Sequence, residues 1–278
     1  MDTCTITIAG RFQQGKSTLV NCLLEGKFAE TGNGLRTTAC NTVYRYGPKK
    51  EKFFLTADGQ KLSPPKNPKN YRPGDRMVVA LPHPLLQNVT IIDSPGVGAS
   101  EADDALAANA IQQSHAVLLL LEKGTLHATE QTILEQCRAS GTKLIVLFNG
   151  KDTNKWHPEE NKFICETIEA QLINSGFHDV ILPIAGKKVF PCNLLWAWNA
   201  VTGKVDDKTK KLDYKLDTPA KCRDASGIQN IRHAIHNIPG ILAMDFMSNM
   251  DSEIERISSK LEAEMDKIIQ ETAKKWNA

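Results

Sequence analysis

The chain has 278 residues, a formal net charge of +2 and 41% hydrophobic residues, so it can bury a sizeable core and is not intrinsically disordered. The near-neutral charge argues against a general electrostatic attraction to nucleic acid, and no apolar run is long enough to cross a bilayer as a helix. Seven dispersed cysteines favour a reducing compartment, and the first strand begins without a preceding signal peptide, so we expect a cytoplasmic protein.

A short strand, a glycine-rich turn and a helix follow one another near the N-terminus. Residues 5–9 are apolar and β-branched, and helical periodicity runs over residues 17–24. The intervening Gly10-Arg-Phe-Gln-Gln-Gly-Lys-Ser17 has the G-x-x-x-x-G-K-S spacing of a phosphate-binding loop. Backbone N–H groups of such a loop face phosphate oxygens, Lys16 can bridge the outer phosphates, and Ser17 can bind Mg²⁺. The sequence therefore predicts a nucleoside triphosphate site.

A polar loop and a predicted edge hairpin come next. Thr38 lies in this loop, where a threonine hydroxyl can bind Mg²⁺ and its backbone N–H can meet the γ-phosphate. Alternating residues at 42–46 and 52–56 predict a hairpin that turns around Gly47-Pro48. Four prolines in residues 59–76 predict an irregular surface insertion.

The first of two motifs at strand ends is Asp93-Ser-Pro-Gly96, which follows the apolar run at 89–92. The Asp93 carboxylate can hold Mg²⁺ there, usually through water, and the Gly96 N–H is free to sense the γ-phosphate. A D-x-P-G turn is common by itself. The phosphate-binding loop earlier in the chain makes it a strong indication of a nucleotide switch.

The second motif, Asn149-Gly-Lys-Asp152, closes the apolar strand predicted at 143–149. The Asp152 carboxylate can accept hydrogen bonds from guanine N1–H and from the guanine 2-amino group. Adenine offers no such pair, so bound adenine would leave a buried carboxylate unsatisfied. The motif therefore favours GTP over ATP.

Apolar runs alternate with helical periods up to residue 192, which is typical of a largely parallel sheet covered by helices. The expected strands are 89–93, 116–121, 143–149 and 189–192, and the expected helices are 101–113, 129–140 and 158–175. The charged stretch 202–224 mixes lysines and aspartates, which predicts a solvated loop.

Two helices are expected in the last part of the chain. The first opens at Ser226-Gly227-Ile228 and ends at Pro239-Gly240, and the second spans residues 247–276. The second helix has an apolar stripe at three- and four-residue spacing, formed by Met250, Ile254, Ile257, Leu261, Met265 and Ile268. This stripe can pack on the preceding domain, pair with another copy or bind a partner protein.

The predicted fold class is α/β. We expect a three-layer P-loop domain in residues 1–240, whose mostly parallel sheet has an antiparallel edge strand. A C-terminal helical extension, residues 241–278, follows it.

The three motifs together resemble the translation-factor-related class of P-loop GTPases over roughly residues 1–240, and most of all the G domain of dynamin-like and mitofusin-like GTPases. Era-like ribosome-assembly GTPases share the second switch and the closing Ser-Gly-Ile helix, so they remain an alternative. The resemblance implies that Ser17, Thr38 and Asp93 serve Mg²⁺. The groups that it implies around the phosphates are the Lys16 ammonium and the backbone of Gln13, Gln14, Gly15, Lys16, Ser17 and Thr18.

The resemblance also implies how the base is bound. Asn149 and Asp152 would read guanine, and Cys192 and Asn193 would touch its O6 edge through backbone or amide N–H groups. Position 150 is glycine where these families often have a lysine whose stem covers the base, and Lys151 is the candidate to replace it. Adenine specificity stays as an alternative for this reason alone.

Catalysis must differ from that of small signalling GTPases. Val97 takes the place of the glutamine that orients water in those proteins, which leaves Lys16, Thr38 and Gly96 around the γ-phosphate. Another group must therefore position the attacking water and offset the developing charge. In dynamin-like and Era-like groups, this group is the third variable position of the loop, a monovalent cation such as K⁺, or a second G domain. The third position here is Gln13, which can donate hydrogen bonds but has no charge.

The leading hypothesis is a dynamin-like GTP hydrolase that forms GDP faster when two G domains pair as a homodimer. The alternative from another class is a nucleotide-dependent binding module with negligible turnover, whose GTP state recruits a partner protein to the tail helix. A role in ribosome assembly is third. It would normally require an RNA-binding domain, which the sequence does not indicate. Peripheral attachment to a membrane is compatible with the resemblance.

Overall fold

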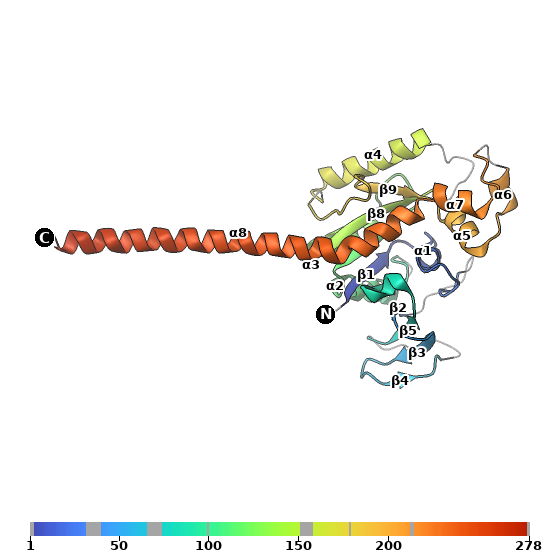
Figure 1. Ribbon diagram of the computed structural model, residues 1–278, viewed down its shortest axis with the longest axis horizontal. Coiled ribbons are helices and arrows are strands. Elements are labelled where there is room, and N and C mark those ends of the chain that lie inside the picture. The colour runs from blue at the N-terminus through green and yellow to red at the C-terminus, as the bar shows by residue number, and fades with distance from the viewer. Residues whose placement is uncertain are drawn as a thin grey trace. The chain divides into compact units, whose positions relative to one another are not determined.

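The computed structural model describes residues 3–31, 40–65, 74–98, 100–150, 158–177, 179–211 and 214–276. The chain divides into two compact units, Met1–His236 and Asn237–Ala278. Within the described residues, the first unit is an α/β domain built on one nine-stranded sheet (Figure 1). The predicted α/β fold class with a long C-terminal helix is therefore confirmed.

The sheet combines a parallel part with antiparallel pairs toward one edge. Its strands are β1 (Cys4–Ala9), β2 (Asn41–Tyr46), β3 (Glu51–Leu55), β4 (Lys61–Leu62), β5 (Arg76–Leu81), β6 (Val89–Asp93), β7 (Ala116–Leu121), β8 (Lys143–Asn149) and β9 (Val189–Cys192). Their order across the sheet is β4-β3-β5-β2-β6-β1-β7-β8-β9. Strands β6, β1, β7, β8 and β9 run parallel, and β2 pairs antiparallel with β6.

Helices alternate with the parallel strands. They are α1 (Lys16–Leu23), the short 3₁₀ helix η1 (Pro84–Gln87), α2 (Glu101–Gln112), α3 (Ala128–Ser140), α4 (Pro158–Asn174), α5 (Leu194–Thr202), α6 (Asp207–Lys210), α7 (Pro219–Ala225) and α8 (Ile228–Trp276). The predicted boundaries of α2, α3 and α4 agree with these to within one residue. None of the helices in the described part of the chain combines the length and hydropathy that a membrane-spanning helix needs.

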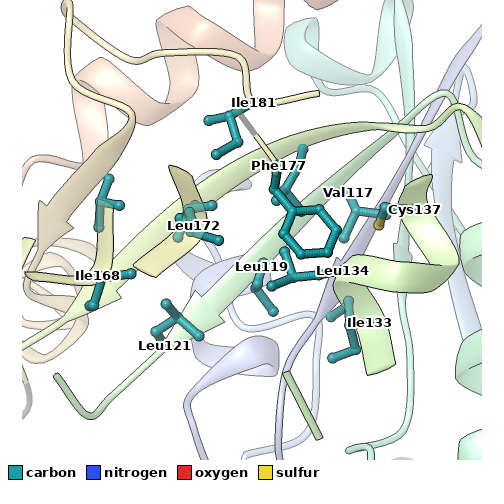
Figure 2. Close-up of a cluster of buried hydrophobic side chains, with 14 of the residues drawn as sticks. Val117, Leu119, Leu121, Ile133, Leu134, Cys137, Ile168, Leu172, Phe177 and Ile181 are labelled. Carbon is teal, nitrogen blue, oxygen red and sulfur yellow. The ribbon is translucent and has the colours of Figure 1, made fainter. Parts of the chain in front are cut away.

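One face of the sheet is covered by α2, α3 and α4. Alternate residues of β7 point to this face and pack against α3 and α4 in a cluster of buried hydrophobic side chains (Figure 2). The members that the figure labels are Val117, Leu119, Leu121, Ile133, Leu134, Cys137, Ile168, Leu172, Phe177 and Ile181. Leu120 points to the opposite face, where α1 and α5 pack against each other. The sheet therefore lies between two helical layers, and the loops at its carboxyl edge are held from both sides.

The predicted hairpin of residues 42–46 and 52–56 is wrong. Strand β5 lies between β2 and β3, parallel to β2 and antiparallel to β3. No strand was predicted at residues 77–81, although this apolar run directly follows the predicted insertion of residues 59–76. Four successive residues of β5, Val78–Leu81, are buried, and a strand that is apolar on both faces is favoured in the interior of a sheet.

The charged stretch 202–224 is also not simply a solvated loop. It contains α6 and α7, and its few apolar residues meet α5 in a small core of their own. This core consists of Trp196, Ala200, Val205, Leu216 and Cys222. The apolar residues are too widely spaced among lysines and aspartates to reveal a period, which is why the composition suggested a loop.

The helix at the C-terminus begins earlier than predicted. The sequence predicts one helix that ends at Pro239-Gly240 and another that starts at residue 247, whereas α8 is continuous from Ile228 to Trp276 with Pro239 inside it. A proline within a helix costs roughly 3 kcal/mol because it removes one backbone hydrogen bond and crowds the preceding turn. The helix continues through this position in spite of that local cost.

The part of α8 in the second unit has many exposed apolar side chains. The large ones along the predicted stripe are Met250, Ile254, Ile257, Leu261 and Met265, which are 44–61% exposed.

Candidate functional site

The phosphate-binding loop connects β1 to α1, and its two glycines are required by geometry. Gly10 has φ +147°, and a Cβ there would lie 2.6 Å from the carbonyl oxygen of Leu120 on β7. Gly15 has φ +101° at the N-cap of α1. Gln13 also has a positive φ, +65°, a backbone conformation that is uncommon for a glutamine. The loop is therefore tightly curled and locally strained, as functional loops often are.

The Lys16 side chain lies over this loop. It is 7% exposed, and its Nζ donates hydrogen bonds to the carbonyl oxygens of Gly10 (3.0 Å) and Arg11 (2.9 Å). The first backbone N–H groups of α1 have no acceptor within the helix, and the helix dipole adds partial positive charge there. An ammonium group and helix N–H donors thus converge at one place, which is favourable for a phosphate group.

The sheet register brings Asp93 next to Ser17. Strands β1 and β6 are parallel with Ile8 opposite Asp93, so both chains leave the sheet at the same edge. Ser17 Oγ donates a hydrogen bond to Asp93 Oδ2 at 2.8 Å. Asp93 is 2% exposed, and among the described residues its Oδ1 has no hydrogen-bond partner. A buried carboxylate oxygen without a partner is costly, and a hard divalent cation such as Mg²⁺ would satisfy it.

The electrostatics of Asp93 agree with this interpretation. Burial raises the pKa of its carboxyl group from 3.8 to about 6, and the Ser17 hydrogen bond and the Lys16 charge oppose the rise only in part. The ionised form is therefore destabilised by its surroundings, and a cation beside it would relieve this cost. Perturbed carboxyl groups of this kind are often found at functional sites.

The segment after β6 lies directly against the phosphate-binding loop. The Val97 N–H donates to the Gly10 carbonyl oxygen at 3.2 Å. A Cβ on Gly96 would lie 2.6 Å from Phe12 Cα, so this close approach of two backbones requires glycine at position 96. Gly96 and the loop are thus adjacent. The contact between the Gly96 N–H and a γ-phosphate stays a prediction.

Asn149 connects the loop to the next part of the site. It is buried at the end of β8, where its Nδ2 donates to the Gln14 carbonyl oxygen (3.1 Å) and its Oδ1 accepts from the Leu194 N–H (3.1 Å). The side chain therefore joins three segments that are distant in sequence. The sequence predicts a contact between Asn149 and the base, and the structure adds this bridging role.

Cys192 and Asn193 lie at the end of β9, beside Asn149. Asn193 is the N-cap of α5, where its Oδ1 accepts from the Trp196 N–H (3.1 Å) and its Nδ2 donates to the Gly150 carbonyl oxygen (2.9 Å). Burial raises the pKa of the Cys192 thiol well above its ordinary value, so the thiol stays protonated. The predicted contact with guanine O6 remains untested.

Three predicted site residues lie outside the described residues: Thr38, Lys151 and Asp152. Thr18 is half-buried in the first turn of α1, and the Gln13 side chain is exposed. The structure thus brings together the phosphate-binding loop, Asp93, Gly96, Asn149 and the start of α5 at one edge of the sheet.

Two side chains have contacts that the sequence analysis did not foresee. Gln14 is 5% exposed, and its side chain turns toward α3, where Glu130 is 1% exposed. Arg11 lies on the same side, with its Nε 3.9 Å from Glu130 Oε1. A glutamate in the first turn of a predicted helix signals a helix cap, but the sequence cannot show that it also reaches the loop.

Comparison with known proteins places this site in a family. The model of the dynamin family matches residues 6–150, slightly more than half of the 278-residue chain. Dynamin-like protein 2 of Campylobacter jejuni is 28% identical over 160 residues, which is 53% of this chain and 26% of the relative. The bacterial dynamin-like protein of Nostoc punctiforme is 30% identical over 139 residues, which is 42% of this chain and 20% of the relative.

The chain thus spans about a quarter of the length of these two relatives. Two solved structures of an oligomerised bacterial dynamin pair, described as sensing and tethering membranes, have the same fold with TM-scores of 0.51 and 0.52. They are 16% and 17% identical, and each alignment covers 84% of this chain and 34% of that chain. Because the family model covers the loop, Asp93, Gly96 and Asn149 together, the chain belongs to the dynamin family.

Proposed function

We propose that the domain in residues 1–240 binds GTP and hydrolyses it to GDP and phosphate. The observation that carries this proposal is the Ser17–Asp93 pair beside the Lys16 ammonium, where one buried carboxylate oxygen has no partner among the described residues. Membership of the dynamin family supports a guanine nucleotide as the ligand.

Ser17 and Asp93, together with Thr38, would hold Mg²⁺. When bound, Mg²⁺ would neutralise negative charge on the phosphate oxygens. The Ser17 hydroxyl already donates a hydrogen bond to Asp93, so the lone pairs of the Ser17 oxygen can face a cation. When a nucleotide binds, Lys16 Nζ would give up its hydrogen bonds to the carbonyl oxygens of Gly10 and Arg11 and donate to phosphate oxygens instead. The flexible stem of the lysine allows this change.

We assign the selection of guanine to Asp152. The stem of the Lys151 side chain would cover the base. Asn149 would act mainly through the segments that it joins, because both ends of its side chain are engaged with backbone groups. Cys192 and Asn193 would bring the start of α5 to the O6 edge of the base. In this arrangement the phosphates lie at α1 and the base at the ends of β8 and β9.

Hydrolysis would depend on positioning and charge. Gln13, Lys16, Thr38 and Gly96 are the groups proposed around the γ-phosphate, and Gln13 lies exposed on the loop, where a second copy of the domain could reach it. The description of two solved structures as an oligomerised bacterial dynamin pair supports self-assembly, and we propose that this assembly is a nucleotide-dependent homodimer. Either this second copy or a monovalent cation such as K⁺ would supply the charge that Gln13 lacks.

The test combines binding and turnover. Fluorescent GTP and ATP analogues would be titrated with Mg²⁺ and with a chelator, and phosphate release would be followed across a wide range of protein concentration. We expect Mg²⁺-dependent binding that prefers GTP, and an activity per molecule that rises with protein concentration.

Each other result has a distinct meaning. Activity that is independent of concentration would exclude pairing, and binding without phosphate release would favour the binding module. Equal affinity for both analogues would remove guanine selection. Absence of binding to either analogue would refute the proposal.

We also propose that the protein acts at a membrane surface as a peripheral protein. The support is the description of the related bacterial dynamin pair as sensing and tethering membranes. Flotation with lipid vesicles in the presence of GDP and of a GTP analogue would test this, and recovery of the protein only in the dense fraction in both states would contradict it.

A further inference from the structure

The Gln14 side chain closes the phosphate-binding loop from within. Its Oε1 accepts the Arg11 N–H at 2.6 Å, which joins the second and fifth residues of the motif. The folded-back side chain occupies the space above Gly10, where a Cβ would lie 2.5 Å from the Gln14 Oε1. Gln14 thus fixes the turn that gives Gln13 and Gly15 their positive φ angles.

Glu130 fixes the other end of this side chain. Gln14 Nε2 donates to Glu130 Oε1 at 3.2 Å, and the Glu130 Oε2 accepts the His127 N–H at 3.1 Å, at the start of α3. The carboxylate therefore lies at the positive end of the α3 dipole and is buried there. Arg11 Nε, 3.9 Å from Oε1, adds a weaker attraction because the Arg11 side chain is 39% exposed.

We propose that Glu130 is a positioning residue for nucleotide binding, which it serves by holding Gln14 and through it the shape of the phosphate-binding loop. This inference rests on the proposed function. Glu130 is not among the groups predicted to touch the nucleotide; it acts through a continuous series of hydrogen bonds from α3 to the Arg11 backbone.

Each hydrogen bond in this series has a fixed donor and a fixed acceptor. A substitution that keeps the size of a side chain but exchanges an acceptor for a donor can therefore break the series. Arg11 N–H and Gln14 Nε2 donate in the same direction, so Glu130 must accept at one oxygen from Gln14 and at the other from His127. A glutamine at position 130 has one oxygen in place of two. It can still cap α3 through the His127 N–H, since glutamine serves in capping boxes, but its NH₂ then faces the NH₂ of Gln14.

The experiment measures the affinity of the full chain for a fluorescent GTP analogue with Mg²⁺, well below the melting temperature of every variant. We expect Glu130→Gln to weaken binding about tenfold, the usual effect of losing one hydrogen bond to a charged group. Glu135→Gln is the matched control, because Glu135 is exposed on the same helix, and it should bind as the wild type does.

A double variant restores the series with reversed polarity. When Gln14→Glu is combined with Glu130→Gln, the carboxylate introduced at position 14 can accept from both the Arg11 N–H and the amide introduced at position 130. The oxygen of that amide still accepts from the His127 N–H. We expect Gln14→Glu alone to bind weakly, because two carboxylates then face each other, and the double variant to recover most of the lost affinity.

The results separate this inference from a structural role and from the proposed function. If the role of Glu130 is merely structural, Glu130→Gln lowers the melting temperature and leaves the affinity of the folded protein for the GTP analogue unchanged. That result would overturn the inference. A double variant that binds no better than either single variant would also overturn it. Binding by the wild type with the same affinity in Glu130→Gln refutes the inference alone. A wild type that binds no GTP analogue refutes the proposed function and this inference with it.

Discussion

Replacing Asp93 with asparagine should stabilise the nucleotide-free protein and reduce the further stabilisation that GTP and Mg²⁺ provide. The folded-state pKa of Asp93, about 6, lies above the ordinary value of 3.8 because the carboxyl group is buried. The folded protein therefore binds the Asp93 proton more tightly than the unfolded chain does. This contribution to stability is complete below pH 3.8 and is lost as the pH rises through 6.

The magnitude follows from the raised pKa. Above pH 6, ionised Asp93 costs the folded state about 3 kcal/mol relative to the unfolded chain. Asparagine keeps the size of the side chain and an oxygen that can accept from Ser17, and it has no charge to bury. Asp93→Asn should thus raise the Tm at about pH 8 by roughly 5 to 10 °C in a domain of this size.

The assay is thermal unfolding of nucleotide-free protein across the pH range, repeated with GTP and Mg²⁺. The Tm advantage of Asp93→Asn should shrink as the pH falls and nearly vanish well below pH 3.8, where wild-type Asp93 is largely protonated in both the folded and the unfolded state. Asp58→Asn, at an exposed position, is the control and should change little. With GTP and Mg²⁺ the wild type should gain more stability than the variant, because binding to the folded state adds to stability. A variant less stable than the wild type at pH 8, or a difference that does not depend on pH, would refute the reasoning.

Three further variants test other parts of the site. Lys16→Ala should lower GTP affinity by roughly tenfold to a hundredfold in a titration, through loss of the ammonium–phosphate contact, and the circular dichroism of the fold should be unchanged. Unaltered affinity would count against the loop assignment. Gly96→Ala should lower the free energy of unfolding by about 1–3 kcal/mol in urea, because the new methyl group would meet the Phe12 backbone; an unchanged urea midpoint would show that the two segments separate freely. Asp152→Asn should shift nucleotide preference from guanine toward xanthine in competition assays, because an amide can donate to the 2-oxo group, and continued preference for guanine would place base selection elsewhere.

Local patterns sufficed where the chemistry is carried by neighbouring residues. The phosphate-binding loop could be predicted because Gly10, Gly15 and Lys16 act within one strand–turn–helix unit, and the parallel strands β6, β7 and β8 are continuous apolar runs. Prediction failed where position in the sheet decides the outcome. The chain makes only a short turn between β2 and β3, yet β5 lies between these two strands in the sheet. The physical reason is that both faces of β5 are apolar and are best buried inside the sheet.

Sequence patterns alone predict the chemical groups of the site: a curled loop with a lysine, a hydroxyl, and acids after two strands. How the described groups act on one another follows from the packing of the folded chain. Parallel pairing of β1 with β6 brings Asp93 within hydrogen-bond distance of Ser17 and buries it, which raises its pKa. Packing of α3 on the same face as α2 and α4 places Glu130 against Gln14, more than a hundred residues away in the chain. Such pairs depend on the register of strands and the docking of helices, and no local period in the sequence specifies either.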